Sequence, residues 1–320
     1  MQKGISSKIT VFLALMLCGR AFYADAQHQG ASYETGDITL KNVVMSSKDS
    51  AAAGNEKTSL TPGAGSVLAK YSKANQLYLK MIDSLTKVLY RYPLIDTSSG
   101  LKYAAEWVGT PNMGLRRPNF VIIHYTANNS CEETLREFTI VGGREASAHY
   151  VVCKDGTIHH MLNDMLRSHH AGESKWGNNT DLNSSSIGIE LVNNGSEAYP
   201  EAQINSLLVL LDRLKTSYKI PVPNFIGHAD VAPARKQDPG AKFPWKTLSE
   251  NGFGLWWDDT TGVQVPEQFD YLMGLRIIGY DISNPDAAVA AFKKHFMGDN
   301  SRTMNSQVRK IIYTLYRKFE

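Results

Sequence analysis

The chain has little net charge, few cysteines and almost no long apolar runs. Its 34 lysines and arginines nearly balance 31 aspartates and glutamates, which leaves a formal net charge of +3 over 320 residues. Nucleic-acid binding proteins usually carry a larger, clustered basic excess, so this balance argues against a nucleic-acid partner. Beyond the first residues, no segment is apolar enough to cross a membrane. No internal repeat is evident, which argues against a repeat array.

The amino-terminal segment has the pattern of a secretory signal peptide. Two lysines precede an apolar stretch over residues 9–17, and Ala24-Asp25-Ala26 supplies an A-x-A cleavage site. We therefore expect residues 1–26 to be removed and the mature protein to act in the periplasm or cell envelope. Cys18 leaves lipid anchoring as an alternative, although Leu17 stands before it, where lipid attachment normally needs a small residue.

Removal of the signal peptide would leave two cysteines, Cys131 and Cys153. An even pair in an oxidising compartment can form a disulfide, and these two flank a predicted helix and the strand that follows it. Sequence spacing does not fix the separation of their Cα atoms, so two free cysteines that serve as small core residues are the alternative.

A proline-punctuated segment, Gly227–Gly240, carries a histidine, a lysine and an aspartate: His228, Lys236 and Asp238. Its two prolines and final glycine disfavour a regular helix, so the backbone can curl and direct His228 and Asp238 at one centre. An imidazole nitrogen and a carboxylate oxygen are ordinary zinc donors, and a catalytic zinc usually takes three protein ligands. The segment supplies two, which predicts a third ligand elsewhere.

Two predicted strands bring further polar groups. The apolar run 120–123 leads directly into His124 and then into a polar loop, a pattern typical of a buried strand that ends at a site. A core histidine bonded to the backbone is the alternative. Within residues 186–193, apolar residues flank Glu190. A carboxylate in such a strand must be paired, metal-bound or neutralised. Glu190 is therefore a candidate general base, with a structural ion pair as the alternative.

The ordered set of these residues resembles the zinc-dependent N-acetylmuramoyl-L-alanine amidases of the type-2 amidase family, relatives of the peptidoglycan-recognition proteins. The resemblance covers about residues 100–250 and is greatest to the periplasmic AmiD-like group, whose members carry a small helical domain after the amidase domain. The motifs that carry it are His124, Glu190, His228 and Lys236-x-Asp238, supported by Ala148–Val152, Lys154–Gly156, His170–Gly172 and Phe243–Trp245.

The resemblance implies a role for each matching residue. His124, His228 and Asp238 would bind Zn²⁺. Glu190 would be the general base and later the proton donor to the leaving amine, and Lys236 would face the developing oxyanion. The reaction implied is hydrolysis of the amide between N-acetylmuramic acid and L-alanine in peptidoglycan or muropeptides. No catalytic position is missing, which argues against a non-catalytic peptidoglycan-recognition module. That module and a zinc peptidase acting within the stem peptide are the alternatives.

Three more residues are candidate substrate contacts. The resemblance places His170 in the substrate-cleft loop of the family. His149 lies on a predicted strand, where a position behind the metal ligands or in the core is its alternative. Tyr125 follows His124 directly and is predicted to line the cleft, with a packing role as the alternative.

The order of strands and helices predicts an α/β (α+β) domain around a central mixed sheet. Ser130-x-x-Glu133 forms a capping box for a helix over 131–140, and Lys154–Gly156 predicts a hairpin between strands near 148–153 and 157–161. The organisation expected from all segments is a signal peptide over 1–26, a flexible linker over 27–65, an N-terminal helical extension over 66–95, the amidase domain over 96–258 and a helical peptidoglycan-binding-like domain over 262–320.

Apolar periodicity predicts three helices in the last domain, over residues 269–278, 285–296 and 308–319. The stretch Leu275–Asp281 resembles the repeat of small three-helix peptidoglycan-binding domains, and a helical cap without wall contact is the alternative. We expect a monomer whose partner is peptidoglycan or a muropeptide.

Overall fold

The computed structural model describes residues 70–89, 117–140 and 145–320. The helices are α4 (Ser72–Leu89), α5 (Cys131–Thr139), α6 (Leu182–Ser185), α7 (Glu201–Tyr218), α8 (His228–Val231), α9 (Trp245–Glu250), α10 (Tyr271–Ile278), α11 (Pro285–Met297) and α12 (Ser306–Tyr316), with 3₁₀ turns η3 (Val222–Asn224) and η4 (Arg317–Phe319). The strands are β1 (Phe120–Tyr125), β2 (Tyr150–Val152), β3 (Ile158–His160), β4 (Ser186–Leu191) and β5 (Phe225–Gly227). The predicted signal peptide and linker lie outside the described residues.

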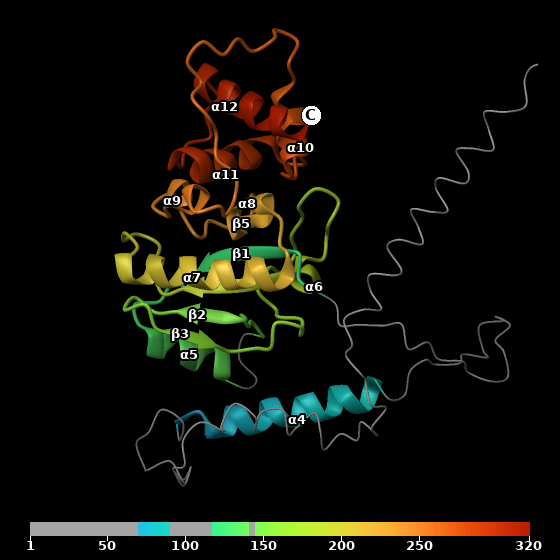
Figure 1. Ribbon diagram of the computed structural model, residues 1–320, viewed down its shortest axis with the longest axis vertical. Coiled ribbons are helices and arrows are strands. Elements are labelled where there is room, and N and C mark those ends of the chain that lie inside the picture. Colours follow the sequence, from blue (N-terminus) through green and yellow to red (C-terminus); the bar gives the residue numbers. More distant parts are fainter. Residues whose placement is uncertain (1–69, 90–116, 141–144) are drawn as a thin grey trace, which may run out of the picture. The chain divides into compact units, whose positions relative to one another are not determined.

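The strands form one mixed sheet in the order β3-β2-β4-β1-β5 (Figure 1). Strands β2, β4, β1 and β5 run parallel to one another, and the edge strand β3 joins β2 as an antiparallel hairpin. The hairpin turn needs a glycine, since Gly156 has a φ of +89°. The predicted α/β architecture, with helices around a mixed sheet, is confirmed.

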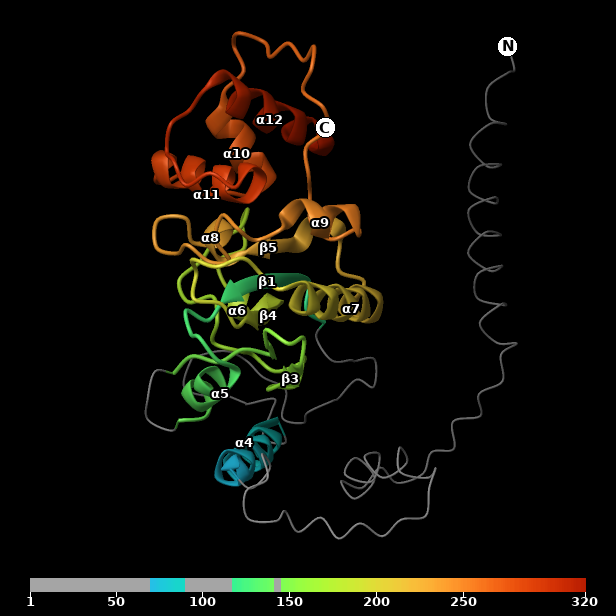
Figure 2. The ribbon, with the colours of Figure 1, turned by 90° about the vertical axis from the view of Figure 1, so that its left-hand side faces the viewer.

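Successive residues of each strand point to opposite faces of the sheet. In β1, Val121 and Ile123 pack toward α7, whereas Ile122 packs on the other face with residues of α6 and α8. Helix α7 covers its face of the sheet in both views (Figures 1 and 2). It contributes a buried leucine stripe, which consists of Leu207, Leu210, Leu211 and Leu214.

The same alternation sends His124 and Glu190 to the face opposite α7. His124 lies two residues after Ile122, and Glu190 lies between Ile189 and Leu191, which both belong to the core on the α7 side. The register of the two parallel strands pairs His124 with Glu190. Both residues therefore stand at the carboxyl ends of neighbouring parallel strands, the edge where open α/β sheets place their ligands.

Helices α10, α11 and α12, here called the helical unit, bury an apolar core of their own. Its fully buried members include Leu275, Ala288, Phe292, Val308, Ile311, Ile312 and Leu315. The unit lies beyond β5 in both ribbon views, and α11 packs against α8 and α9 (Figures 1 and 2). The three helices predicted from periodicity are confirmed, with small changes at their ends.

Two elements near the predicted metal ligands were not expected. Strand β5 has only three residues, too few for a period-two pattern to be visible. Helix α9 begins directly after Pro244. The irregular segment expected over 227–240 begins with one helical turn, α8, and is irregular only after it.

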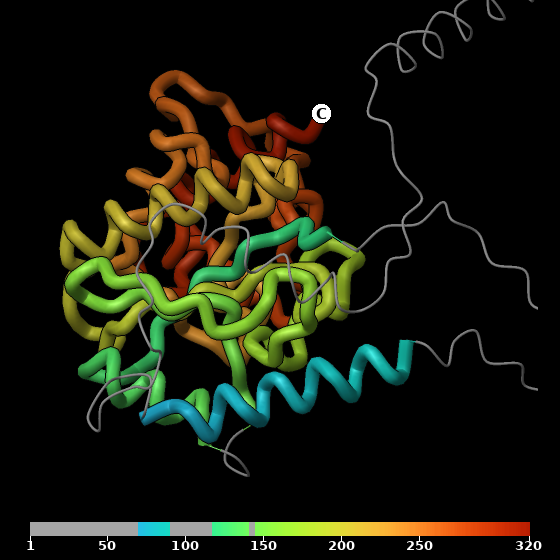
Figure 3. Tube along the Cα trace, turned by 60° about the horizontal axis from the view of Figure 1, so that its bottom comes forward, coloured from blue at the N-terminus to red at the C-terminus, as the bar shows by residue number. Residues whose placement is uncertain are grey.

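The predicted N-terminal helical extension contains α4, none of whose residues is buried. In this helix, drawn in blue in Figure 3, Leu79 and Leu89 are 65% and 73% exposed. Within the described ranges, no helix combines the length and the apolarity that a membrane span requires.

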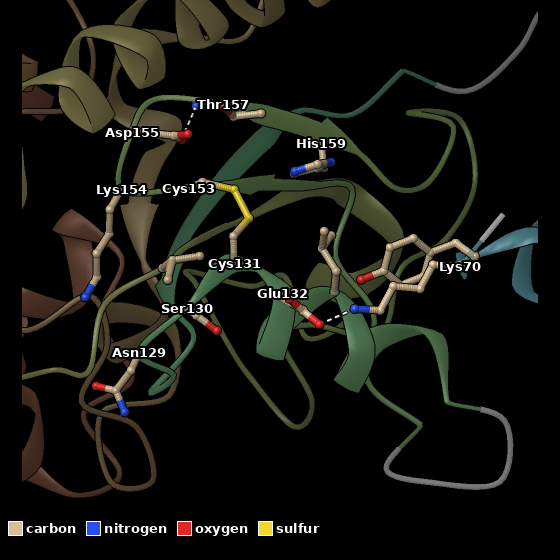
Figure 4. A pocket seen from close by; sticks show the side chains of 13 residues that line it. Lys70, Asn129, Ser130, Cys131, Glu132, Cys153, Lys154, Asp155, Thr157 and His159 are labelled. Atoms are coloured by element: carbon tan, nitrogen blue, oxygen red, sulfur yellow. Dashed lines mark hydrogen bonds and ion pairs between the residues drawn. A yellow bond between two sulfur atoms is a disulfide. The ribbon is translucent and has the colours of Figure 1, made fainter. Parts of the chain in front are cut away.

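Cys131 and Cys153 form a disulfide between the start of α5 and the residue after β2. Their Cα atoms are 5.4 Å apart, within the usual range for a bridge. The bridge lies at a surface pocket that is also lined by His159 (Figure 4). Of the two alternatives left by the sequence, the structure has the disulfide, and both sulfurs are therefore withdrawn from metal binding.

The disulfide predicts a stability effect without an effect on metal binding. Replacing both cysteines by serine removes a crosslink across 22 residues, so the free energy of unfolding should fall by about 3 kcal/mol. Thermal and urea unfolding measure the change. Reducing agent should destabilise the wild type to a similar degree and leave the double variant unaffected. A double variant as stable as the oxidised wild type would contradict the bridge.

Candidate metal centre and active site

Three side chains from two parts of the chain converge on one point. His124 Nδ1 lies 2.9 Å from His228 Nδ1 and 3.0 Å from Asp238 Oδ2, and His228 Nδ1 lies 2.9 Å from the same carboxylate oxygen. All three residues are buried. His124 ends β1, while His228 opens the helical turn α8 directly after β5, the next strand in the sheet. The structure thus brings together the three residues predicted as metal ligands.

The outer nitrogen of His228 is fixed by the backbone. Its Nε2 atom lies 3.1 Å from the carbonyl oxygen of Ala171, which can only accept a hydrogen bond. Arg235 donates to the same carbonyl at 2.9 Å. His228 therefore carries its proton on Nε2 when neutral, and Nδ1 presents a lone pair toward His124 and Asp238.

The outer nitrogen of His124 is fixed by a chain of side chains. Its Nε2 atom lies 3.0 Å from His170 Nδ1, and His170 Nε2 lies 3.0 Å from Ser186 Oγ. Ser186 donates its hydroxyl proton to the carbonyl of Leu182, so its oxygen accepts the proton of His170. The Nδ1 atom of His170 consequently accepts from His124, whose own Nδ1 presents a lone pair toward the other two ligands.

The protonation states agree with this assignment. Burial, with a contribution from His228, lowers the pKa of His124 to about 4. Burial, with a contribution from His124, also holds the pKa of His170 well below its ordinary value. For Asp238, burial would raise the pKa of the carboxyl, but its contacts with the two imidazoles hold it below the ordinary value. At neutral pH His124 and His170 are neutral and Asp238 is ionised.

This donor set fits a divalent metal. Two imidazole lone pairs and a carboxylate oxygen within 3.0 Å of one another repel unless a cation lies among them. Two nitrogens and one oxygen are a usual set for a catalytic zinc, which takes three protein ligands and leaves one position open. The outer hydrogen bonds to Ala171 and His170 are of the kind that orient metal-binding imidazoles.

The two predicted catalytic residues lie at the rim of this centre. Glu190 is paired in register with His124 on the neighbouring strand and points to the same face of the sheet. Lys236 lies two residues before Asp238 and lines a pocket of about 260 Å³ together with His228 and His170. Their placement is compatible with the predicted roles of base and oxyanion partner, which stay predictions.

The three predicted substrate contacts differ in their placement. His170 lines the same pocket, although both of its ring nitrogens are engaged behind His124. Tyr125 is partly exposed, and burial and the nearby Asp238 raise the pKa of its hydroxyl. His149 is fully buried. It accepts from the backbone of Gly188 and donates to the carbonyl of Leu166, which favours its alternative role behind the site over a substrate contact.

A glycine in β4 makes room for His170. A Cβ atom at Gly188 would lie 2.4 Å from Cγ of His170, closer than any side chain allows. The imidazole therefore packs directly on the strand backbone. From there its Nδ1 atom reaches His124, two residues beyond the β1 partner of Gly188.

Sequence reasoning missed several residues of the site. Asn183 accepts from the backbone N–H groups of His170 and Ala171 at 3.0 and 2.8 Å and so shapes the loop that supports His124 and His228. Ser186 ends the hydrogen-bond chain from His124, and Arg235 holds the Ala171 carbonyl. Only their position in the sequence could have pointed to them. Each is a polar residue that borders a buried strand or a predicted ligand.

Residues 114–241 match the sequence profile of the family described as N-acetylmuramoyl-L-alanine amidase (Amidase_2). The matched residues resemble a type-2 amidase domain and are called the amidase domain below. All three candidate metal ligands lie within it, as do Glu190 and Lys236.

Named relatives are similar to part of this chain. The N-acetylmuramoyl-L-alanine amidase AmiD of Escherichia coli K12 is 35% identical in an alignment 158 residues long that covers 44% of this chain and 56% of the relative. The 1,6-anhydro-N-acetylmuramyl-L-alanine amidase AmpD of Citrobacter freundii is 36% identical over 108 residues, which are 34% of this chain and 58% of the relative. The chain thus spans little more than half the length of these curated relatives.

Solved structures extend the similarity past the amidase domain. The E. coli AmiD structure in complex with a muropeptide substrate superposes with a TM-score of 0.58 at 28% identity and covers 66% of this chain and 93% of that chain. The structure of AmpDh3 from Pseudomonas aeruginosa superposes with a TM-score of 0.59 at 29% identity and covers 68% and 98%.

Removal of one carboxylate tests the metal centre of the amidase domain. We expect Asp238→Ala to weaken zinc binding by more than about 100-fold, since a direct ligand should matter at least as much as an outer partner. Zinc content after purification and chelator competition measure the effect. Asp212→Ala, on the exposed face of α7, is the matched control and should bind as the wild type does. A zinc-replete Asp238→Ala protein would remove this residue from the site.

Proposed function

We propose that this protein is a zinc-dependent amidase that hydrolyses the bond between N-acetylmuramic acid and L-alanine in peptidoglycan or muropeptides. The observation that carries the proposal is the convergence of His124, His228 and Asp238 inside a type-2 amidase domain. Their two imidazole nitrogens and one carboxylate oxygen form a ready ligand set at the edge where the parallel strands end.

The residues around the centre divide the chemistry between them. A bound Zn²⁺ would supply Lewis acidity, through polarisation of the scissile carbonyl and a lower pKa of the attacking water. Glu190 would take the proton of that water and pass it to the leaving amine of L-alanine. Lys236 would stabilise the negative charge that develops on the carbonyl oxygen. His170 and Ala171 would keep the two imidazoles oriented throughout.

The substrates in related structures support the substrate class. The E. coli AmiD complex contains anhydro-N-acetylmuramic acid-L-Ala-D-γ-Glu-L-Lys, and an AmpDh3 complex contains anhydromuramic pentapeptide. Both molecules include a muramic acid and a stem peptide. The full set of ligand, base and lysine in this chain favours catalysis over the non-catalytic recognition alternative.

The proposed place of action is the periplasm or cell envelope. The signal-peptide pattern of residues 1–26 is the sequence basis for export. The Cys131–Cys153 bridge agrees with it, because disulfides persist mainly in oxidising compartments.

Metal content and product identity test the proposal together. We expect about one zinc per chain, and muropeptide hydrolysis that stops on chelation and returns with added zinc. Mass spectrometry should detect an intact stem peptide that begins with L-alanine. Products that keep alanine on the sugar would indicate a peptidase instead, and wall binding without any hydrolysis would indicate a recognition module.

The assigned base predicts a separation of turnover from metal binding. Glu190→Gln should retain zinc but lose about 100-fold or more in kcat, because the side chain can no longer accept a proton. Glu197→Gln is the control, since Glu197 pairs with Lys154 at the surface and should leave kcat unchanged. Loss of zinc from the Glu190→Gln protein would instead make Glu190 a ligand.

A further inference from the structure

A buried carboxylate lies beside the metal centre and is not part of it. Asp230 is 2% exposed and stands in the helical turn α8, two residues after His228. Its Oδ2 atom accepts the backbone N–H of Gly227 at 2.7 Å. The carboxylate therefore fixes the backbone just before His228 from a position just after it, and so holds the turn that carries this ligand.

The other two partners of Asp230 come from the helical unit. Tyr280, between α10 and α11, donates its hydroxyl to Oδ1 at 2.7 Å, and His295 of α11 donates from Nδ1 to Oδ2 at 2.7 Å. Both side chains are buried. A carboxylate taken out of water needs such donors, so the conformation of the turn depends on residues 50 and 65 positions away.

Packing fixes both donors in place. The imidazole of His295 stacks on the Trp245 indole, with ring centroids 3.9 Å apart and planes 9° from parallel. Tyr280 packs edge-on against Trp176, at 5.0 Å between centroids, and Trp176 follows the loop that contains Ala171. Asp230, Tyr280 and His295 are called the Asp230 cluster below.

A second contact joins the helical unit to the segment that carries Asp238. Lys294, next to His295 in α11, donates its ammonium to the side chain of Gln237, the residue before Asp238. The backbone N–H of Ala229 donates to the carbonyl of Asp238 at 2.7 Å. Helix α11 thus holds, through neighbouring residues, the two chain segments that supply His228 and Asp238.

We propose that Tyr280 and His295 are positioning residues for the metal centre, so that the helical unit sets metal affinity and turnover besides any contact with the cell wall. The inference rests on the proposed function, because it concerns the zinc site of the amidase domain. Without these donors the α8 turn loses its support, and the His228 Nδ1 atom moves relative to His124 and Asp238.

Single-group variants test the proposal. Tyr280→Phe deletes one hydroxyl, and His295→Leu deletes one N–H donor. We expect each to weaken zinc binding about tenfold, in the range found for outer partners of metal ligands, and to lower kcat at saturating zinc. His295→Asn, whose amide N–H can replace the Nδ1 donor, should restore both values toward the wild type. Chelator competition gives the zinc affinity without any reference to catalysis.

Leu315→Ala is the matched control for a loosened helical unit. Leu315 is fully buried in the core of α10–α12 and is not a partner of Asp230. This variant should lower Tm and leave zinc affinity unchanged. If Tyr280→Phe and His295→Leu behave like Leu315→Ala, with lower Tm but wild-type zinc affinity and kcat, the cluster only joins the two parts of the molecule and the proposal is overturned.

Zinc binding by the wild type separates the positioning role of Tyr280 and His295 from the proposed function. A wild type that binds zinc and hydrolyses muropeptides, with variants that bind zinc equally well, overturns the positioning role alone. A wild type that takes up no zinc overturns the metal site and the positioning role with it. Should His295→Leu fail to fold, Tyr280→Phe still decides, because it removes a single oxygen atom.

Discussion

The site depends on one constraint: the imidazoles of His124 and His228 must both direct Nδ1 at the same carboxylate oxygen of Asp238. A neutral imidazole has one N–H and one lone pair, so its outer nitrogen must have an acceptor if the inner one is to bind a metal. His228 has the carbonyl of Ala171, and His124 has the chain through His170. Both acceptors come from the loop before β4, so that loop orients two of the three candidate metal ligands without being one of them.

The parallel strands of the sheet place the residues of the site next to one another. Parallel neighbours bring His124 and Glu190 side by side at the ends of β1 and β4, with His228 at the end of β5. Strand alternation turns the first two away from the core beneath α7. Gly188 leaves the space on the strand in which the ring of His170 lies. Because side chains two residues apart on a strand lie on the same face, Gly188 and Glu190 of β4 stand on the face that carries His124.

Sequence reasoning succeeded where the signal was local. The capping box at Ser130, the hairpin turn at Gly156 and the apolar periodicity of α11 each depend on a few nearby residues, and each element is present. The ligand set came from resemblance and chemistry, since no spacing rule relates residues 104 positions apart. The histidine chain, the disulfide geometry and strand β5 escaped sequence reasoning because they depend on three-dimensional packing that local patterns do not encode.

Asp230 is the residue whose environment local sequence patterns predict least well. In the sequence it is one acidic residue within the motif that carries His228, and nothing marks it as buried. In the structure its carboxylate accepts hydrogen bonds from both parts of the molecule. The backbone of Gly227 donates from the amidase domain, and Tyr280 and His295 donate from the helical unit. A unit that only tethered the amidase domain to another surface would not need a buried contact beside His228, because an exposed linker and an independent core would suffice. Placing an ionisable group there has a desolvation cost, and the gain that offsets it is a fixed backbone next to His228.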